Sequence, residues 1–339
     1  MEQAKPLARA ARDPKIEVLE LKEDYIKFVL SDTDASVANA LRRVLIAETP
    51  TVAIDLVEIA ENSSALHDEF IAHRLGLIPI RISSQEGVSG MNYKQDCFCD
   101  STCPRCSVKF TLDVSHDDPD EAVRIVTSAD LKSDSAFAVQ YSSTEEDDFV
   151  KETNPDLPSG ITIVKLGPGQ RIKCDCIAVK GISKIHAKWC PVSVATFAYD
   201  PEIELNDALM DELDLAKKQE FVKSCPADVF NLDEQTEKVS VSKRSACMFC
   251  DECVKLGETW KRSHEEDNVV SVSQVPNRFI FSVETTGALK PDEAVFSALK
   301  VLQDKLTLIG RHLSEIPPEV QEVPLKENQG GFVDTGGFI

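Results

Sequence analysis

The sequence predicts an α+β protein that has a β-hairpin near its start and two amphipathic helices. Residues 15–30 hold two apolar-rich stretches around Lys22, Glu23 and Asp24, which is typical of a β-hairpin. Apolar residues recur at helical spacing soon after this hairpin and again after Pro291. The chain has 339 residues, enough for two domains of ordinary size.

Residues 31–50 predict the first helix. Ser31, Thr33 and Asp34 are candidates for its N-cap, and Pro50 ends it. Four apolar residues inside it follow the spacing i, i+4, i+7 and i+8, namely Val37, Leu41, Val44 and Leu45. The helix is therefore expected to be amphipathic.

The middle of the chain predicts mainly strands. Residues 51–59 are rich in β-branched side chains and predict a strand, and a short helix should follow and end near Gly76 and Pro79. Residues 161–181 predict two strands joined by a turn into a hairpin, whereas the acidic residues 116–158 predict irregular structure. One further helix is expected over residues 206–225.

The second amphipathic helix begins at Pro291 and must end before Pro317. Its apolar residues alternate spacings of four and three, which is the a/d pattern of a packed seam, at Val295, Leu299, Leu302, Leu306, Ile309 and Leu313. Two interpretations remain open. The helix lies on the protein's own sheet, or it shares its seam with a helix of a partner, because six seam positions exceed what one small sheet usually needs.

The amino-acid composition limits whether the protein binds a membrane, a nucleic acid or another protein. Hydrophobic residues make up 42% and charged residues 28%, and no apolar run approaches the ~20 residues that span a bilayer. The net charge of −21 argues against binding a nucleic-acid backbone, which needs clustered Lys and Arg. The acidity fits protein partners or simple solubility equally well. No secretory signal is visible at the N-terminus, so a reducing compartment is expected.

One group of cysteines predicts a structural zinc. Four thiols fall within ten residues, in DCFCDSTCPRC, at Cys97, Cys99, Cys103 and Cys106. Two close pairs joined by a turn can surround Zn(II) tetrahedrally, and Zn(II) prefers thiolates in closed structural sites. With four sulfur ligands no position stays open for water, so the zinc should not be catalytic. Idle or redox-active thiols are the alternative.

A second group has ferredoxin-like spacing. CMFCDEC gives the C-x2-C-x2-C pattern, and a remote cysteine followed by proline completes the set Cys225, Cys247, Cys250 and Cys253. This set predicts a [4Fe-4S] cluster, with a second zinc or unligated thiols as alternatives. Cys174, Cys176 and Cys190 are expected to be small buried hydrophobes. The sequence shows no phosphate-binding glycine loop and no Ser/His/Asp order, so no catalytic residues are predicted.

Three segments resemble the α-like subunits of cellular RNA polymerases. They are VANALRRVLIAETPTVAIDLVEI, NSSALHDEFIAHRLGLIPI and KGISKIHAKWCPVSVATFAYDP. The resemblance covers roughly residues 15–110 and 160–201, and the helix after Pro291 stands where the family has its dimerisation helix.

The resemblance implies a discontinuous dimerisation domain. Residues 14–52 and 187–316 would form this domain, and residues 53–186 would form a β-rich, zinc-bearing insert domain. A small ferredoxin-like insertion would occupy residues 206–268, as in archaeal relatives. Residues 1–13 and 317–339 are expected to be disordered tails.

The resemblance also implies a function, that of a non-catalytic scaffold in the nucleus. The ten apolar residues of the two amphipathic helices would contact a smaller α-like subunit. The pair would then nucleate assembly with the second-largest subunit and two small zinc-binding subunits. The four-cysteine site corresponds to the polymerase II branch and is lacking in the branch shared by polymerases I and III. That shared branch is one alternative, and an iron-sulfur electron carrier is another. A zinc-dependent regulator acting alone on DNA is disfavoured by the acidic charge.

Overall fold

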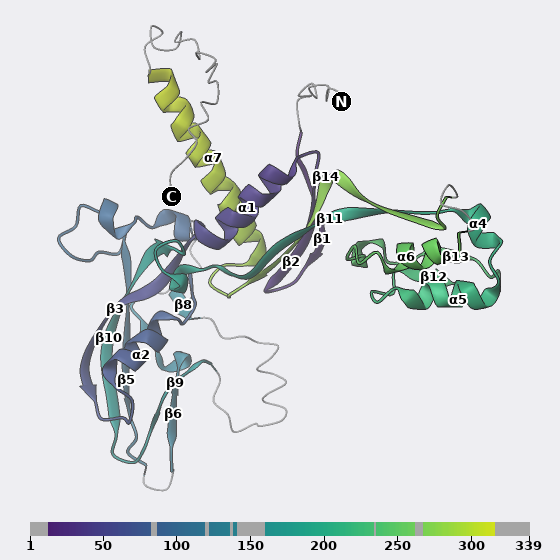
Figure 1. Ribbon diagram of the computed structural model, residues 1–339. Helices are drawn as coiled ribbons and strands as arrows, with labels where there is room; N and C mark the ends of the chain where they lie inside the picture. The colour runs from purple at the N-terminus through teal and green to yellow at the C-terminus, as the bar shows by residue number, and fades with distance from the viewer. Residues whose placement is uncertain are drawn as a thin grey trace, which may run out of the picture.

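A computed structural model describes residues 13–82, 87–118, 122–135, 138–140, 160–233, 235–261 and 267–315. The expected tails, 1–13 and 317–339, lie outside these residues apart from Asp13. The described chain is a mixture of helices and antiparallel strands, which confirms the predicted α+β class. Figure 1 shows a central sheet with two long helices and a lobe at each end. Among the described residues, no helix combines the length and the apolar character needed to cross a membrane.

The central sheet joins the two ends of the chain. Its strands have the order β1-β2-β14-β11 and are all antiparallel, with bounds Lys15–Leu21 for β1, Tyr25–Ser31 for β2, Val192–Leu205 for β11 and Val270–Thr285 for β14. The hairpin predicted over residues 15–30 is confirmed by the pairing of β1 with β2. Phe28 of β2 stacks on Phe281 of β14 with ring centroids 4.9 Å apart. This pair places the N-terminal and C-terminal strands in one hydrophobic core.

Two helices contact this sheet and each other, α1 (Ala35–Ala47) and α7 (Pro291–Glu315). Both were predicted, and both are confirmed. The α1 helix begins where the sequence indicates, because the Asp34 carboxylate accepts a hydrogen bond of 3.0 Å from the backbone N–H of Val37. It ends where Thr49 donates its hydroxyl proton to the carbonyl of Val44.

The second sheet forms the lobe at one end. Its six strands have the order β7-β5-β10-β3-β4-β8, with bounds Pro50–Asn62 for β3, Ile80–Ile82 for β4, Ser107–Ser115 for β5, Lys132–Ser133 for β7, Ala138–Gln140 for β8 and Arg171–Ile182 for β10. The short helix α2 (Asp68–Gly76) packs on β3. The chain enters the lobe through β3 and leaves through β10, which pair side by side along most of their length.

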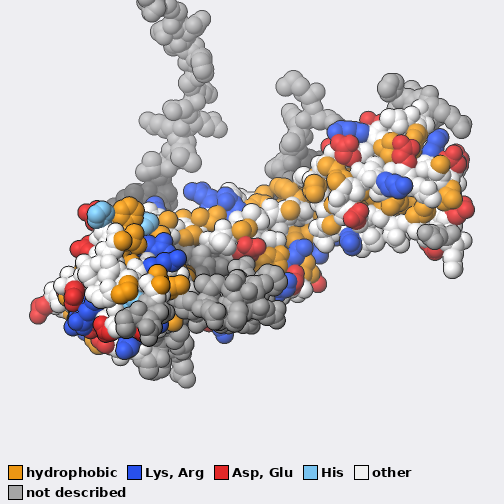
Figure 2. Space-filling view, turned by 90° about the horizontal axis from the view of Figure 1, so that it is seen from below, with side chains coloured by type: hydrophobic (Ala, Val, Ile, Leu, Met, Phe, Trp, Pro, Cys, Tyr) orange, Lys and Arg blue, Asp and Glu red, His pale blue; other side chains and the backbone are white. Residues whose placement is uncertain are grey.

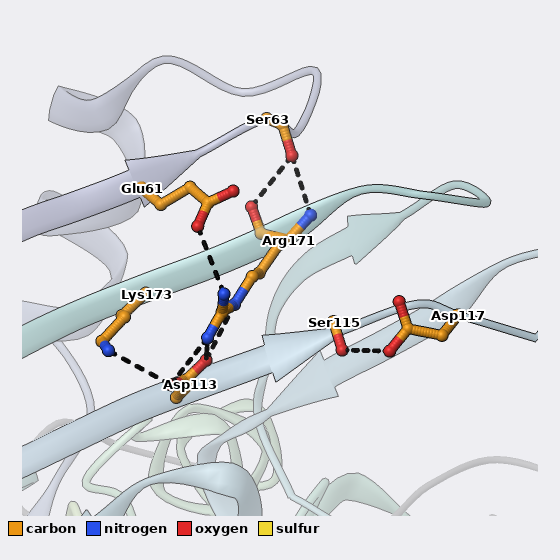
Figure 3. Close-up of polar contacts among 7 residues, drawn as sticks. All are labelled: Glu61, Ser63, Asp113, Ser115, Asp117, Arg171 and Lys173. Carbon is orange, nitrogen blue, oxygen red and sulfur yellow. Dashed lines mark hydrogen bonds and ion pairs between the residues drawn. The ribbon is translucent and has the colours of Figure 1, made fainter.

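Charged side chains join three strands of this sheet on its exposed side (Figure 3). Arg171 of β10 donates to Asp113 of β5 from Nη2 at 2.8 Å and from Nε at 3.0 Å, and its Nη1 lies 3.5 Å from Glu61 of β3. Lys173 approaches the same Asp113 at 3.6 Å. Hydrogen bonding to Arg171 lowers the pKa of Asp113 below its ordinary value.

The hairpin predicted over residues 161–181 is wrong. The turn forms, but β9 (Thr162–Leu166) pairs with β6 (Arg124–Thr127), whereas β10 pairs with β3 and β5. Both edges of β10 are therefore occupied, and no edge is left for β9. The expectation of irregular structure over residues 116–158 is likewise wrong for β6, β7 and β8; residues 119–121, 136–137 and 141–159 lie outside the described chain.

The lobe at the other end lies between β11 and β14. It contains α4 (Asp207–Asp211), α5 (Leu215–Ser224), β12 (Phe230–Leu232), β13 (Val239–Val241), the 3-10 turn η5 (Arg244–Ala246) and α6 (Glu252–Thr259). Its buried residues form a hydrophobic cluster of their own around Phe221 and Phe230. The single helix predicted over residues 206–225 is two helices, because Asp214 caps the N-terminus of α5 by accepting from Lys217 N.

Candidate metal centre and dimerisation surface

Four cysteine sulfurs meet in the loop that leads into β5. Cys97 follows the 3-10 turn η2 (Lys94–Asp96), and Cys106 immediately precedes β5. Three Sγ–Sγ distances are 3.6 Å, namely Cys97 to Cys103, Cys99 to Cys106, and Cys103 to Cys106. All four sulfurs lie within 4.8 Å of one another, and Cys106 is buried. Ligands 2.3 Å from a tetrahedral zinc stand about 3.8 Å apart, so this set fits a single ion of that size.

Backbone hydrogen bonds shape the turn at these cysteines and affect the pKa of one thiol. The chain turns at Cys103, whose carbonyl accepts from the backbone N–H groups of Cys106 and Ser107, both at 3.0 Å. Hydrogen bonding to the Arg105 backbone lowers the pKa of Cys103 to about 6, which favours its thiolate at neutral pH. Hydrogen bonding with Cys97 raises the pKa of Cys99 to about 12. A lowered pKa suits a metal ligand, because a cysteine binds a metal ion as the thiolate.

The second cysteine group lines one pocket in the opposite lobe. Cys225 ends α5, Cys247 follows η5, Cys250 lies in the next loop, and Cys253 is in the first turn of α6. Unlike the first group, these sulfurs do not form a set lying within 4.8 Å of one another. Four thiols that line one pocket are ligands that zinc and iron-sulfur clusters both use. The structure therefore brings together all four residues that the ferredoxin-like spacing indicated.

The loop around this pocket is strained and tightly held. Phe249 and Asp251 have φ values of 54° and 60°, a left-handed conformation that costs non-glycine residues free energy. Val229 N donates to Cys225 Sγ at 3.5 Å. Apart from the four cysteines and Asp251, the side chains that line the pocket are apolar.

The ten apolar residues predicted to contact a partner fall into two sets. Leu41, Val44 and Leu45 of α1 and Val295 of α7 are buried in the protein's own core. The others are exposed or half-buried, at Val37, Leu299, Leu302, Leu306, Ile309 and Leu313. Leu306 is 69% exposed although it belongs to the same heptad series as buried Val295. The first turns of α7 therefore pack on the sheet, and its later turns project beyond it (Figure 1).

The prediction missed other exposed apolar residues beside this seam. Phe296 and Leu308 of α7 are 74% and 53% exposed, and β1 adds Ile16 and Val18 at the edge of the sheet. Phe296 follows a seam position directly, so the heptad count passes over it, although its bulk was a visible signal. Figure 2 shows hydrophobic side chains along the middle of the molecule between the two lobes, with Lys and Arg beside them.

Comparison with known proteins identifies the family to which the chain is related. A profile of the RNA polymerase Rpb3/Rpb11 dimerisation domain matches residues 27–306. The chain is 42% identical over 311 residues to "DNA-directed RNA polymerase II subunit rpb3" of Dictyostelium discoideum, covering 91% of this chain and 98% of that protein. It is also 42% identical to "DNA-directed RNA polymerases II, IV and V subunit 3" of Arabidopsis thaliana, over 88% and 91% of the two chains.

A relative from the other branch is less similar. The chain is 30% identical over 314 residues to "DNA-directed RNA polymerases I and III subunit rpac1" of Dictyostelium discoideum, covering 91% of this chain and 85% of that protein. From one organism, the polymerase II protein thus matches better than the one of polymerases I and III. By its domain match and by its coverage of these relatives, the chain belongs to the Rpb3/Rpb11 family of RNA polymerase subunits.

Proposed function

We propose that this chain is the α-like scaffold subunit of RNA polymerase II and that it pairs with a smaller α-like subunit through α7 and α1. The observation that carries this proposal is the exposed apolar seam on the later turns of α7, at Leu306, Ile309 and Leu313. The dimerisation-domain match spans this seam as far as residue 306, and the names of the relatives above supply the polymerase.

The energetics favour a partner for this helix. The α7 helix has 25 residues and is about 37 Å long, so its later turns extend past the support of the sheet. Fully burying one Leu or Ile side chain contributes about 1.5–3 kcal/mol. Three such side chains against a partner helix supply free energy that the lone protomer does not obtain. Interfaces of this obligate kind commonly bury over ~2,000 Å².

This scaffold has two domains and, beyond the smaller α-like subunit, further polymerase subunits as partners. Residues 14–52 and 187–316 form the dimerisation domain, and residues 53–186 form the insert domain, which the zinc at Cys103 and its three neighbours holds in shape. The heterodimer nucleates assembly with the second-largest subunit and two small zinc-binding subunits in the nucleus. Catalysis belongs to the large subunits. The acidic net charge of −21 supports contacts with proteins rather than with a nucleic-acid backbone.

Co-expression tests the pairing. The chain alone should aggregate, and the chain produced with the smaller α-like subunit of the same polymerase should elute as a stable heterodimer in gel filtration. Mass spectrometry of the assembled complex then identifies the polymerase from its other subunits. A well-behaved monomer from solo expression, or a complex with subunits of polymerases I and III only, would overturn the assignment.

We further propose that Cys225, Cys247, Cys250 and Cys253 bind a [4Fe-4S] cluster. The single pocket that all four line supports this assignment. Such a cluster supplies structural ligation and, where its potential is reversible, electron transfer. Anaerobic purification followed by iron analysis and visible absorption tests it. Iron-free, colourless protein would refute it, and reversible reduction of the cluster would instead favour the iron-sulfur carrier as a second function.

A further inference from the structure

A buried carboxylate stands where the second cysteine lobe meets the central sheet. Asp200 of β11 has a side chain only 4% exposed. Its Oδ2 accepts from Arg244 Nη2 at 2.6 Å and from Arg278 Nε at 2.9 Å. Arg278 belongs to β14, whereas Arg244 belongs to the lobe, in η5. One oxygen atom therefore joins the lobe to the sheet.

The backbone changes register at the same place. Tyr199 pairs with Phe279, but Asp200, the next residue, pairs with Val275. Residues 276–278 thus bulge from β14, and the first of them is a proline, which has no N–H for the ladder. Beyond the bulge, β11 and β14 continue alone as a two-stranded ribbon that carries the lobe (Figure 1). The ion pair between Arg244 and Asp200 therefore connects the lobe to the end of the ribbon that lies at the sheet.

The lobe side of this ion pair is attached to the cysteine pocket. Arg244 begins a single 3-10 turn, and its carbonyl accepts from Cys247 N at 3.1 Å. The preceding residues Ser242 and Lys243 both donate to the carbonyl of Val229, which lines the pocket. Cys247 is one of the four proposed ligands, and this one turn links its backbone to Arg244. A change in the position of Cys247 on iron binding would therefore be passed to Arg244.

We propose that the Arg244–Asp200 ion pair couples occupancy of the second cysteine group to the orientation of its lobe on the dimerisation sheet. Asp200 is a positioning residue in this scheme, since it touches Arg244 and not the metal. The inference rests on the iron-sulfur site proposed above. Coupling between binding and orientation is reciprocal, so a lobe released from the sheet holds the cluster more weakly.

The rate of iron release measures this coupling. The full chain, co-expressed with its smaller partner and loaded anaerobically with iron and sulfide, is mixed with a ferrous chelator. Asp200→Asn and Arg244→Ala should each release iron about tenfold faster, as supporting contacts of metal ligands typically affect affinity ~10–100-fold. Lys255→Ala is the matched control, because it breaks the exposed 3.4 Å pair with Glu252 on α6 without touching the sheet. It should change the rate less than about twofold.

The effect of salt on the rate of iron release distinguishes a positioning role of the Arg244–Asp200 pair from a general loss of stability. Arg244 is 51% exposed, so added salt screens its attraction to Asp200 and should speed iron release from the wild type. The same salt should leave the rate of Asp200→Asn unchanged. In hydrogen exchange, loading should protect the ribbon residues 200–205 and 270–275 in the wild type but not in Arg244→Ala.

Two outcomes would overturn the proposal, and they differ. If the wild type binds iron but all three variants release it at the same rate, the coupling is refuted and the proposed cluster is not. A wild type that binds no iron would refute the iron-sulfur site and the coupling with it.

Discussion

Individual side chains gather at two separate places in the six-stranded lobe. At one end, Cys103 and its three neighbours converge in the loop before β5, and Cys106 alone among them is buried. At the other end, Arg171 ties β10 to both of its neighbouring strands on a solvent-exposed surface. The first group could hold a metal ion, and the second depends on the charge of a carboxylate.

Cys103→Ser should lower the affinity for zinc by more than ~100-fold and destabilise the insert domain, because structural zinc binding is folding free energy. Metal analysis and thermal unfolding check both effects. The control is Cys190→Ser, which keeps a donor for the carbonyls of Ile46 and Val192 and lies outside the four-cysteine group. Unchanged zinc content in the Cys103 variant would refute the site.

Asp113→Asn should make the six-stranded lobe less stable at neutral pH but not at an acidic pH below the folded pKa of Asp113. The pKa of Asp113 is lowered in the folded protein, so its ionised form stabilises above the unfolded value near 3.8, and this contribution is lost as pH falls through the folded pKa. Urea unfolding at both pH values measures the difference from the wild type. The control Asp117→Asn removes a nearby carboxylate bonded to Ser115 rather than to Arg171. An equal deficit at both pH values would contradict the assignment.

At the scale of elements, α7 combines two environments along one helix. Its early turns bury Val295 and Ala298, and its later turns expose the same heptad stripe. The same a/d pattern continues along the whole helix, but its surroundings change from the protein's own core to solvent. Packing on the protein's own sheet is confirmed for the early turns of α7, and packing on a partner stays a prediction for the exposed later turns.

Leu306→Asp should reduce recovery of the heterodimer at least tenfold, because it places a charge in an apolar seam, and tenfold corresponds to only about 1.4 kcal/mol. Pull-down of the smaller subunit with the tagged chain measures the loss. Asp304→Lys is the control, since it alters charge on the same helix at a heptad position opposite the seam. Equal losses in both variants would attribute the effect to the helix rather than to the seam.

The sequence was sufficient for elements whose signals are local. Capping by Asp34 and the heptads after Pro291 act within one helix, and both helices form as predicted. The strand that pairs with β9 could not be predicted from neighbouring residues. Its choice depends on β3 and β5, which are distant in sequence and occupy both edges of β10. Asp200 carried no pattern at all, since its two arginines are 44 and 78 residues away along the chain. The cysteine groups were visible because their spacing is itself local.

At the scale of the whole molecule, two lobes are inserted into one small sheet. The lobe between β11 and β14 has its own hydrophobic cluster, and its connecting ends pair directly, Leu205 with Val270. Such an insertion can be removed without breaking the register of the sheet that carries it.

Replacing residues 206–269 with an Asn-Gly turn should preserve the heterodimer and the zinc while abolishing bound iron, because Asn-Gly then closes a two-residue hairpin between the paired strand ends Leu205 and Val270. Gel filtration with metal analysis measures all three properties. As a control, the full-length Cys250→Ser variant should lose iron and keep the lobe. A truncated chain that no longer pairs would show that the lobe supports the dimerisation surface.

The stacking of Phe28 on Phe281 has a consequence for synthesis. Because β2 pairs with β14, the N-terminal hairpin leaves the ribosome some 250 residues before its neighbour in the sheet. At ~5–20 residues per second, that interval is on the order of tens of seconds. The six-stranded lobe is completed within this interval, while the hairpin and α1 still lack their core. The sheet closes when β14 is made, so the surface proposed for a partner on α1 and α7 is complete only after both of these distant segments exist.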